Sequence, residues 1–143
     1  MTTTKHERSE LVASARNAMR RAYAGYSGFR VGAALMTESG EVFEGCNVEN
    51  SSYGLTMCAE RNAVFQAVAH GKRKFRSIAI ASDDAGFLSP CGACCQVLAE
   101  FNSHLEIILT TASGKIKVTS LHRLFPVPPD LKKLSRRKPQ SAK

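Results

Sequence analysis

Four consecutive segments of the chain decide its fold: CAERNAVFQAVAH (58–70), SIAIAS (77–82), SPCGACCQVLAEFN (89–102) and LEIILT (105–110). Apolar residues recur at helical spacing in the first and third segments. The second and fourth are short apolar runs with the length of buried strands. Helix and strand therefore alternate, which is typical of a mixed sheet with helices on its faces.

The sequence on either side of these segments adds further elements to the sheet. Residues 9–24 predict an amphipathic helix, and residues 30–37 and 42–46 predict two strands joined by a hairpin turn. Downstream, residues 116–119 predict a strand and residues 120–124 a short helix. The predicted order is therefore α-β-β-α-β-α-β-β, followed by the short helix.

Two helix starts can be predicted more closely from their residues. The segment 58–70 begins at Cys58 and is followed by Gly71, a typical helix stop. In the segment 89–102, Ser89 is the expected N-cap and Pro90 the expected first helical residue. Both helices follow loops at the same end of the predicted sheet, so we expect their N-termini to face each other.

The length and charge of the chain favour one folded domain with a tail. The chain has 143 residues and a net charge of +8. Residues 131–143 carry six basic and no acidic side chains, whereas residues 1–130 are close to neutral. We therefore expect a single domain over 1–130 and a basic, disordered tail over 131–143. A near-neutral body argues against a nucleic-acid-binding surface.

The composition also predicts the compartment. No apolar run approaches the roughly 20 residues of a membrane span, and residues 1–10 are polar, unlike a secretory signal. The cysteine count is odd, which favours metal binding or catalysis over a disulfide framework. A cytoplasmic protein without membrane contact is the expectation.

Three of the five cysteines have the spacing of a metal site. Cys91 and Cys94 are three residues apart at a helix start, so they share one face. Cys58 opens the other helix, with Glu60 in its first turn. Helix N-termini favour thiolate over thiol, and thiolate is the form that binds zinc. The pattern predicts one Zn²⁺ bound by Cys58, Cys91 and Cys94.

Two uses of such a zinc ion remain open from the residues alone. A structural site needs four protein ligands, whereas a catalytic site keeps one position for water. Cys95 points elsewhere because it directly follows Cys94 on a helix, which leaves Cys46 as the other candidate ligand. Three thiolates and a nearby carboxylate favour the catalytic kind. Arg61 is then either a charge-balancing group or an ordinary surface residue.

Several motifs together resemble the cytidine deaminase family of the small, homotetrameric kind. They are Asn47-Val48-Glu49-Asn50, Cys58-Ala59-Glu60-Arg61 and Pro90-Cys91-Gly92-Ala93-Cys94. The segment from Tyr26 to Leu35 resembles the family's N-terminal strand, and the whole resemblance covers roughly residues 10–125. It implies a three-layer α/β/α fold with a mixed five-stranded sheet, and a homotetramer whose sites are shared between subunits.

The resemblance also implies an activity and residue roles. The reaction would be hydrolytic deamination of free cytidine and deoxycytidine in pyrimidine salvage, by zinc-bound hydroxide with Glu60 as proton shuttle. Asn47 and Glu49 would hold the ribose 3′-hydroxyl. A carboxylate at Glu49 independently argues against a 3′-phosphate, and so against a nucleic-acid strand. The further substrate contacts implied are Phe29, Ala59 and Tyr53, the last reaching a neighbouring subunit's site.

Two departures from the family pattern and two other functions qualify this interpretation. Cys95 stands where the family usually has arginine, and the segment 125–131 is shorter than the family's usual C-terminal segment. One other function is deamination of a related cytosine nucleoside such as blasticidin S. The other is a zinc-stabilised nucleic-acid-binding protein that uses the basic tail.

Overall fold

Strand β1 (Val31–Thr37) has no exposed residue, which requires that both faces of the sheet are covered. In this computed structural model, which describes residues 2–129, the side chains of Val31 and Leu35 enter one hydrophobic core. Those of Ala34 and Met36 enter a second core on the opposite face. Strand β3 (Phe75–Ser82) alternates in the same way, so the centre of the sheet separates two cores.

Three further strands complete the sheet: β2 (Val42–Cys46), β4 (Glu106–Thr110) and β5 (Ile116–Ser120). The order across the sheet is β2-β1-β3-β4-β5. Only the β3–β4 pair is parallel among these strands of the described chain, and the other neighbours are antiparallel. The predicted mixed five-stranded sheet is therefore confirmed.

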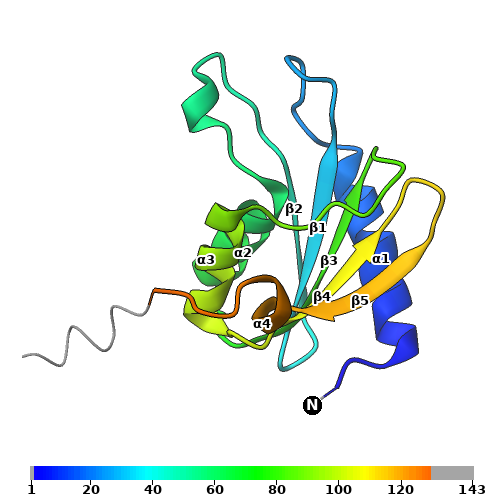
Figure 1. The fold of residues 1–143 in the computed structure, drawn as a ribbon, viewed down its shortest axis with the longest axis vertical. Coiled ribbons are helices and arrows are strands. Elements are labelled where there is room, and N and C mark those ends of the chain that lie inside the picture. The colour runs from blue at the N-terminus through cyan, green and yellow to red at the C-terminus, as the bar shows by residue number, and fades with distance from the viewer. Residues whose placement is uncertain (1, 130–143) are drawn as a thin grey trace, which may run out of the picture.

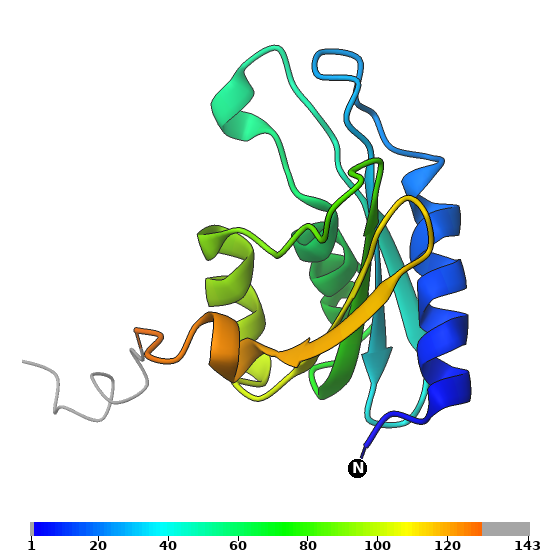
Figure 2. The same cartoon turned by 45° about the vertical axis from the view of Figure 1, so that its right-hand side comes forward.

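The helices lie on both faces of this sheet (Figure 1). Helix α1 (Lys5–Met19) covers one face, where Leu11 and Ala15 enter the smaller core. Helices α2 (Ala59–Ala69) and α3 (Gly92–Phe101) lie side by side on the other face, as the turned view in Figure 2 also shows. The short helix α4 (Leu121–Leu124) follows β5 and contacts α3. The three-layer α/β/α arrangement is as expected.

The start of α1 differs from the sequence-based prediction. The helix begins at Lys5 rather than at Ser9, because Thr4 and Glu7 form a capping box. The Glu7 backbone N–H donates to Thr4 Oγ1, and the Thr4 N–H donates to the Glu7 carboxylate. The apolar periodicity starts only with Leu11, so the cap carried the signal for this boundary. The helix also ends earlier than predicted, at Met19.

The start of α3 also corrects a prediction. Ser89 is not the N-cap and Pro90 is not in the helix, because Cys91 has the extended backbone of an N-cap, with φ −68° and ψ 169°. The Cys95 N–H donates to the Cys91 carbonyl, which closes the first helical turn. Cys58 is the N-cap of α2 in the same way, with φ −72° and ψ 152°. Both helices thus begin with a cysteine just outside the helical backbone.

The two outer layers lie close against the sheet at two glycines. A Cβ added at Gly32 would lie 2.0 Å from the Ala15 carbonyl oxygen of α1. A Cβ added at Gly45 would lie 2.4 Å from both the Ala59 carbonyl oxygen and the Ala63 nitrogen of α2. The neighbouring atoms are helix backbone, which cannot rotate out of the way. Helix α2 can therefore lie this close to β2 only because Gly45 has no side chain.

Gly45→Ala is expected to lower the free energy of unfolding by about 1–3 kcal/mol, because the methyl group overpacks a helix–sheet contact. The shift would also move Ala59, the residue after Cys58, and so weaken metal binding. Urea denaturation and the zinc content of the purified variant measure both effects. Gly54→Ala is the matched control, since a Cβ there would have no heavy atom within 4 Å. Equal stability of the two variants would contradict the close-packing explanation.

Two sequence-based expectations concern parts that this structure does not test. The basic tail predicted over 131–143 lies outside the described residues. The domain boundary at residue 130 therefore stays a prediction. Among the helices that the structure describes, none combines the length and the apolar character of a membrane span.

Candidate metal centre

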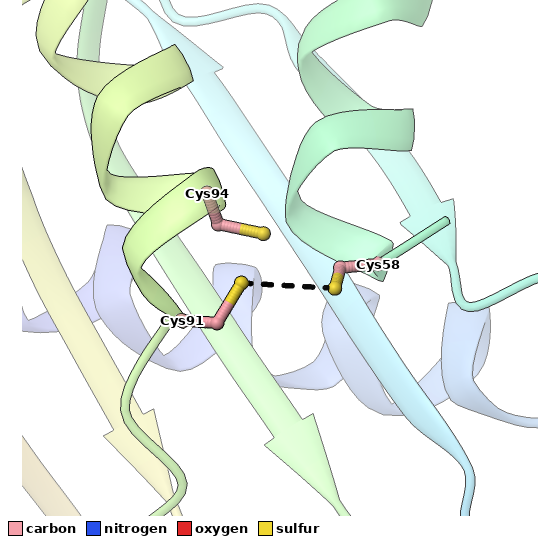
Figure 3. Close-up of side chains that lie close together, drawn as sticks. All are labelled: Cys58, Cys91 and Cys94. Carbon is pink, nitrogen blue, oxygen red and sulfur yellow. Dashed lines mark hydrogen bonds between the residues drawn. The ribbon is translucent and has the colours of Figure 1, made fainter. Parts of the chain in front are cut away.

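Three thiols meet where the N-termini of α2 and α3 face each other (Figure 3). Cys58 and Cys91 come from the two N-cap positions, and Cys94 comes from the first turn of α3. Neither cap thiol makes a side-chain capping hydrogen bond. Both sulfur atoms are instead turned toward the gap between the helices. The structure thus brings together the three cysteines that the spacing singled out.

The spacing of the sulfur atoms fits a zinc ion. All three Sγ atoms lie within 4.8 Å of one another, and Cys58 Sγ is 3.9 Å from Cys91 Sγ. Zinc–sulfur bonds of about 2.3 Å in tetrahedral geometry place sulfur atoms about 3.8 Å apart. The soft thiolate donors are also those that zinc prefers. The cluster can therefore hold Zn²⁺ with little rearrangement.

The two remaining cysteines point away from this cluster. Cys95 is buried, and its thiol donates to the Pro90 carbonyl at 3.6 Å. The Cys46 thiol donates to the Arg21 carbonyl at 3.6 Å. Within residues 2–129, these thiols leave the cluster with three sulfur ligands, so a bound ion keeps one position open. That arrangement is typical of a catalytic rather than a structural zinc site.

Arg61 lies against the cluster rather than on the open surface. Its Nη2 atom donates to Cys58 Sγ at 3.4 Å, across one turn of α2. Three thiolates bring a charge of −3 to a site whose metal ion brings +2. A guanidinium in contact with one sulfur offsets part of that excess negative charge. Of the two interpretations of Arg61, the position favours charge balance.

The thiols differ in how readily they lose a proton. A hydrogen bond from Cys94, with help from the nearby Arg61 guanidinium, lowers the pKa of Cys58 to about 5. The pKa of Cys94 is raised, because this thiol donates to Cys58 and because it is buried. These shifts favour the thiolate form of Cys58. Such a preformed negative charge attracts a cation.

Glu60 is buried beside the thiols. Its residue is 5% exposed, in the first turn of α2, and its carboxylate interacts with the Cys94 thiol. Burial raises the pKa of Glu60, and the negative charge of Cys58 acts in the same direction. A buried carboxyl group with a raised pKa beside a metal site is suited to proton transfer.

The side chain of Asn47, expected to hold the ribose, is hydrogen-bonded to the protein backbone. It is buried, and its side-chain oxygen accepts a hydrogen bond from the Val31 N–H at 2.9 Å. Its amide nitrogen donates to the Phe29 carbonyl at 2.8 Å. Asn47 therefore fixes the start of β1. One amide hydrogen of its side chain remains for a further acceptor.

Glu49 and Phe29 lie close to each other at the loop that precedes β1. The Glu49 carboxylate accepts hydrogen bonds from the backbone of Tyr26 and Ser27 and from the Ser27 hydroxyl. Hydrogen bonds from Ser27, first its hydroxyl and then its N–H, lower the pKa of Glu49, which favours the ionised form. Phe29 is 36% exposed, so it is not an ordinary core aromatic residue.

The last two predicted contacts lie in opposite surroundings. Ala59 is the first residue of α2 and has no exposed surface. Tyr53 is 74% exposed in the loop between β2 and α2, which projects beyond the sheet (Figures 1 and 2). Its ring packs edge-on against Tyr26, with ring centroids 5.9 Å apart. Tyr53 is therefore joined to the loop that contains Ser27.

Two contributions to this region were missed from the sequence. Ser27 supports Glu49, and its position two residues before Phe29 is the available signal, since serine often closes such a turn. Arg30 forms an ion pair with Asp83, and the Arg30 N–H also donates to that carboxylate. This pair joins the start of β1 to the loop that leads into Cys91, and no sequence pattern indicated it.

Comparisons with known proteins agree with this geometry. A family model described as the cytidine and deoxycytidylate deaminase zinc-binding region matches residues 5–110. The cytidine deaminase of Sporosarcina psychrophila is 48% identical over 118 residues, which cover 82% of this chain and 87% of that protein. The blasticidin-S deaminase of Bacillus cereus is 30% identical over 105 residues, covering 68% of this chain and 74% of that protein.

A solved structure is similar in fold as well as in sequence. The 1.6 Å crystal structure of cytidine deaminase from Burkholderia pseudomallei superposes with a TM-score of 0.83 at 48% sequence identity. The match covers 88% of this chain and 99% of that one. The region matched by the family model contains the whole thiol cluster. The chain therefore belongs to the cytidine and deoxycytidylate deaminase family of zinc-binding enzymes.

Proposed function

We propose that this enzyme converts free cytidine and deoxycytidine, with one water molecule, to uridine and deoxyuridine plus ammonia. The observation that carries the proposal is the juxtaposition at the facing helix ends: three thiols, the buried Glu60 carboxyl and the Arg61 guanidinium. The chain's membership of the deaminase family and its 48% identity to a cytidine deaminase support the same reaction.

The residues of the chain divide the chemical tasks. Zinc held by Cys58, Cys91 and Cys94 would supply water with a pKa low enough to act as a nucleophile at neutral pH. Glu60 would take one proton from this water and deliver it to the ring nitrogen N3. It would then pass the second proton, released as the new C4 hydroxyl becomes a carbonyl, to the amino group, which leaves as ammonia. Arg61 offsets the excess charge of the thiolates.

The sugar would be held by the loop residues above the sheet. Glu49 accepts the 3′-hydroxyl, the remaining amide hydrogen of Asn47 donates to the same group, and Phe29 packs on the base or sugar. Ala59 lines the base through its backbone. An ionised carboxylate at Glu49 disfavours a 3′-phosphate, which supports a free nucleoside over a nucleic-acid strand.

The subunit arrangement and cellular setting are parts of the same proposal. We propose a homotetramer in which Tyr53 reaches a neighbour's site. Three large exposed side chains support such contacts, because Tyr53, Leu55 and Phe65 are 74%, 67% and 47% exposed. Five free cysteines support the reducing cytoplasm as the compartment and pyrimidine salvage as the setting.

Two other functions are less well supported. Blasticidin S is the alternative substrate, and the 30% identity to a blasticidin-S deaminase is lower than the 48% to a cytidine deaminase. A purely structural zinc in a nucleic-acid-binding protein would call for a fourth protein ligand. In the described part of the chain, Cys46 and Cys95 are both turned to backbone carbonyls instead.

Zinc analysis combined with ammonia release across a substrate panel tests the proposal. The panel comprises cytidine, deoxycytidine, cytidine 3′-monophosphate, blasticidin S and a cytosine-containing DNA strand. We expect one zinc per chain and turnover of the first two compounds. The 3′-phosphate should react at least about tenfold more slowly, because it meets the Glu49 carboxylate. Preferred turnover of blasticidin S, or salt-dependent binding of the DNA strand without ammonia release from any compound, would overturn the proposal.

A further inference from the structure

The Ser27 hydroxyl forms a bridge between two of the residues assigned to substrate binding. It accepts a hydrogen bond from the Phe29 N–H at 3.0 Å and donates one to Glu49 Oε2. Gly28 between them has φ +70°, a left-handed conformation that glycine adopts without strain. The chain can therefore turn tightly enough for a single hydroxyl to reach both neighbours.

The same contacts use up most of the acceptor capacity of Glu49. A carboxylate has about four acceptor positions, two on each oxygen. Oε1 accepts from the Tyr26 N–H and the Ser27 N–H, each at 3.0 Å. Oε2 accepts from the Ser27 hydroxyl. One acceptor position remains on Oε2, and Ser27 determines the direction in which it points.

We propose that Ser27 is a positioning residue for substrate: its hydroxyl orients Glu49 so that the free position on Oε2 receives one sugar hydroxyl of the nucleoside. This inference rests on the proposed function, because it assigns a role within the same site. The Phe29 contact adds that the residue packing on the nucleoside is anchored to the same hydroxyl. Ser27 thereby couples the two contacts, although it touches neither the metal cluster nor Glu60.

The orientation matters because, within residues 2–129, the Ser27 hydroxyl is the donor that fixes Oε2. The two backbone donors hold only Oε1, so without the Ser27 hydroxyl the carboxylate can pivot about that oxygen. A pivoting acceptor binds a hydroxyl more weakly, and the loss falls on ground-state and transition-state binding alike. The consequence is a higher KM with kcat largely retained.

Three variants test this assignment. Ser27→Ala removes the hydroxyl, and Ser27→Thr keeps it. Ser39→Ala removes a matched hydroxyl in the β1–β2 hairpin, where Ser39 donates to Glu41 at 3.1 Å, far from the thiol cluster. All three are assayed on the zinc-loaded full chain with cytidine and with 3′-deoxycytidine, after zinc content and thermal unfolding have been measured.

We expect Ser27→Ala to lower kcat/KM for cytidine about tenfold, mainly through KM, while zinc content stays unchanged. Ser27→Thr should remain within about threefold of the wild type, and Ser39→Ala should not differ from it. For 3′-deoxycytidine the effect of Ser27→Ala should be clearly smaller, because Glu49 has no hydroxyl to receive and only the Phe29 contact is affected.

Two results would overturn the inference while the proposed function stands: an active wild type with an unaffected Ser27→Ala variant, or an equal loss with both nucleosides. A wild type inactive on both nucleosides would overturn the proposed function and the inference together. The Ser27→Thr variant separates a lost hydroxyl from a disturbed loop, because a loss equal to that of Ser27→Ala would show that the hydroxyl is not the cause.

Discussion

Cys91→Ala is expected to remove most of the bound zinc and, with it, the deaminase activity. The cluster described here has three thiols, and the loss of one leaves two ligands at an ion that protein sites bind with three or four. The fall in zinc affinity should exceed the roughly 10- to 100-fold that the loss of an outer-shell partner costs. Elemental analysis of the purified variant measures the zinc that remains bound.

Cys46→Ala is the matched control for this variant. Cys46 is also a free cysteine, but its thiol donates to the Arg21 carbonyl and lies outside the cluster. We expect it to keep a full complement of zinc. One zinc per chain in Cys91→Ala would show that the ligand assignment is wrong, even if the variant were inactive for another reason.

Apolar periodicity was sufficient to predict the sheet and the placement of its helices. The alternation of strand and helix from residue 58 to residue 110 required helices on the faces of a mixed sheet, and β2 was predicted with its observed ends. The predicted starts of two helices were wrong because apolar periodicity does not mark the N-cap residue. Helix α1 starts at a capping box before its apolar residues begin, and α3 starts at a cysteine rather than at Ser89.

The metal cluster could be predicted because both halves of it are local. Cys91 and Cys94 share a helix turn, and Cys58 starts a helix at the same end of the sheet, so topology alone brings them together. The surroundings of Asn47 could not be predicted. Its partners are the backbone of Val31 and Phe29, which become neighbours only when the end of β2 pairs with the start of β1.

Glu60→Gln is expected to retain zinc and fold but to lose roughly 10²- to 10⁴-fold in the rate of deamination, the contribution typical of a general acid–base group. Glutamine has nearly the same shape as glutamate, and a neutral amide suits a site that is 5% exposed. Packing should therefore survive. Glutamine cannot take up and return a proton, so the rate of deamination should fall.

The four histidines all lie within the described residues 2–129, and none of them is placed to take over this task. His104 and His122 stack on each other with ring centroids 4.8 Å apart, His70 packs on Phe43, and His6 pairs with Glu10 on the surface. The buried carboxyl of Glu60 is therefore the group left to protonate the ring nitrogen and the departing amine. Without it, the amine would have to leave as an amide ion, a very poor leaving group.

The competing explanation is that Glu60 only balances charge beside the thiols and Arg61. A charge-balancing group would alter zinc affinity and stability when neutralised, yet allow substantial turnover once metal is bound. Single-turnover formation of uridine by zinc-loaded protein separates the two roles, because zinc occupancy is then equal in both samples. Glu41→Gln is the control, since Glu41 forms an ion pair with Lys72 on the protein surface. A Glu60→Gln rate within tenfold of the wild type would rule out the proton shuttle. A loss of 10²-fold or more at full zinc occupancy would rule out charge balance as the explanation.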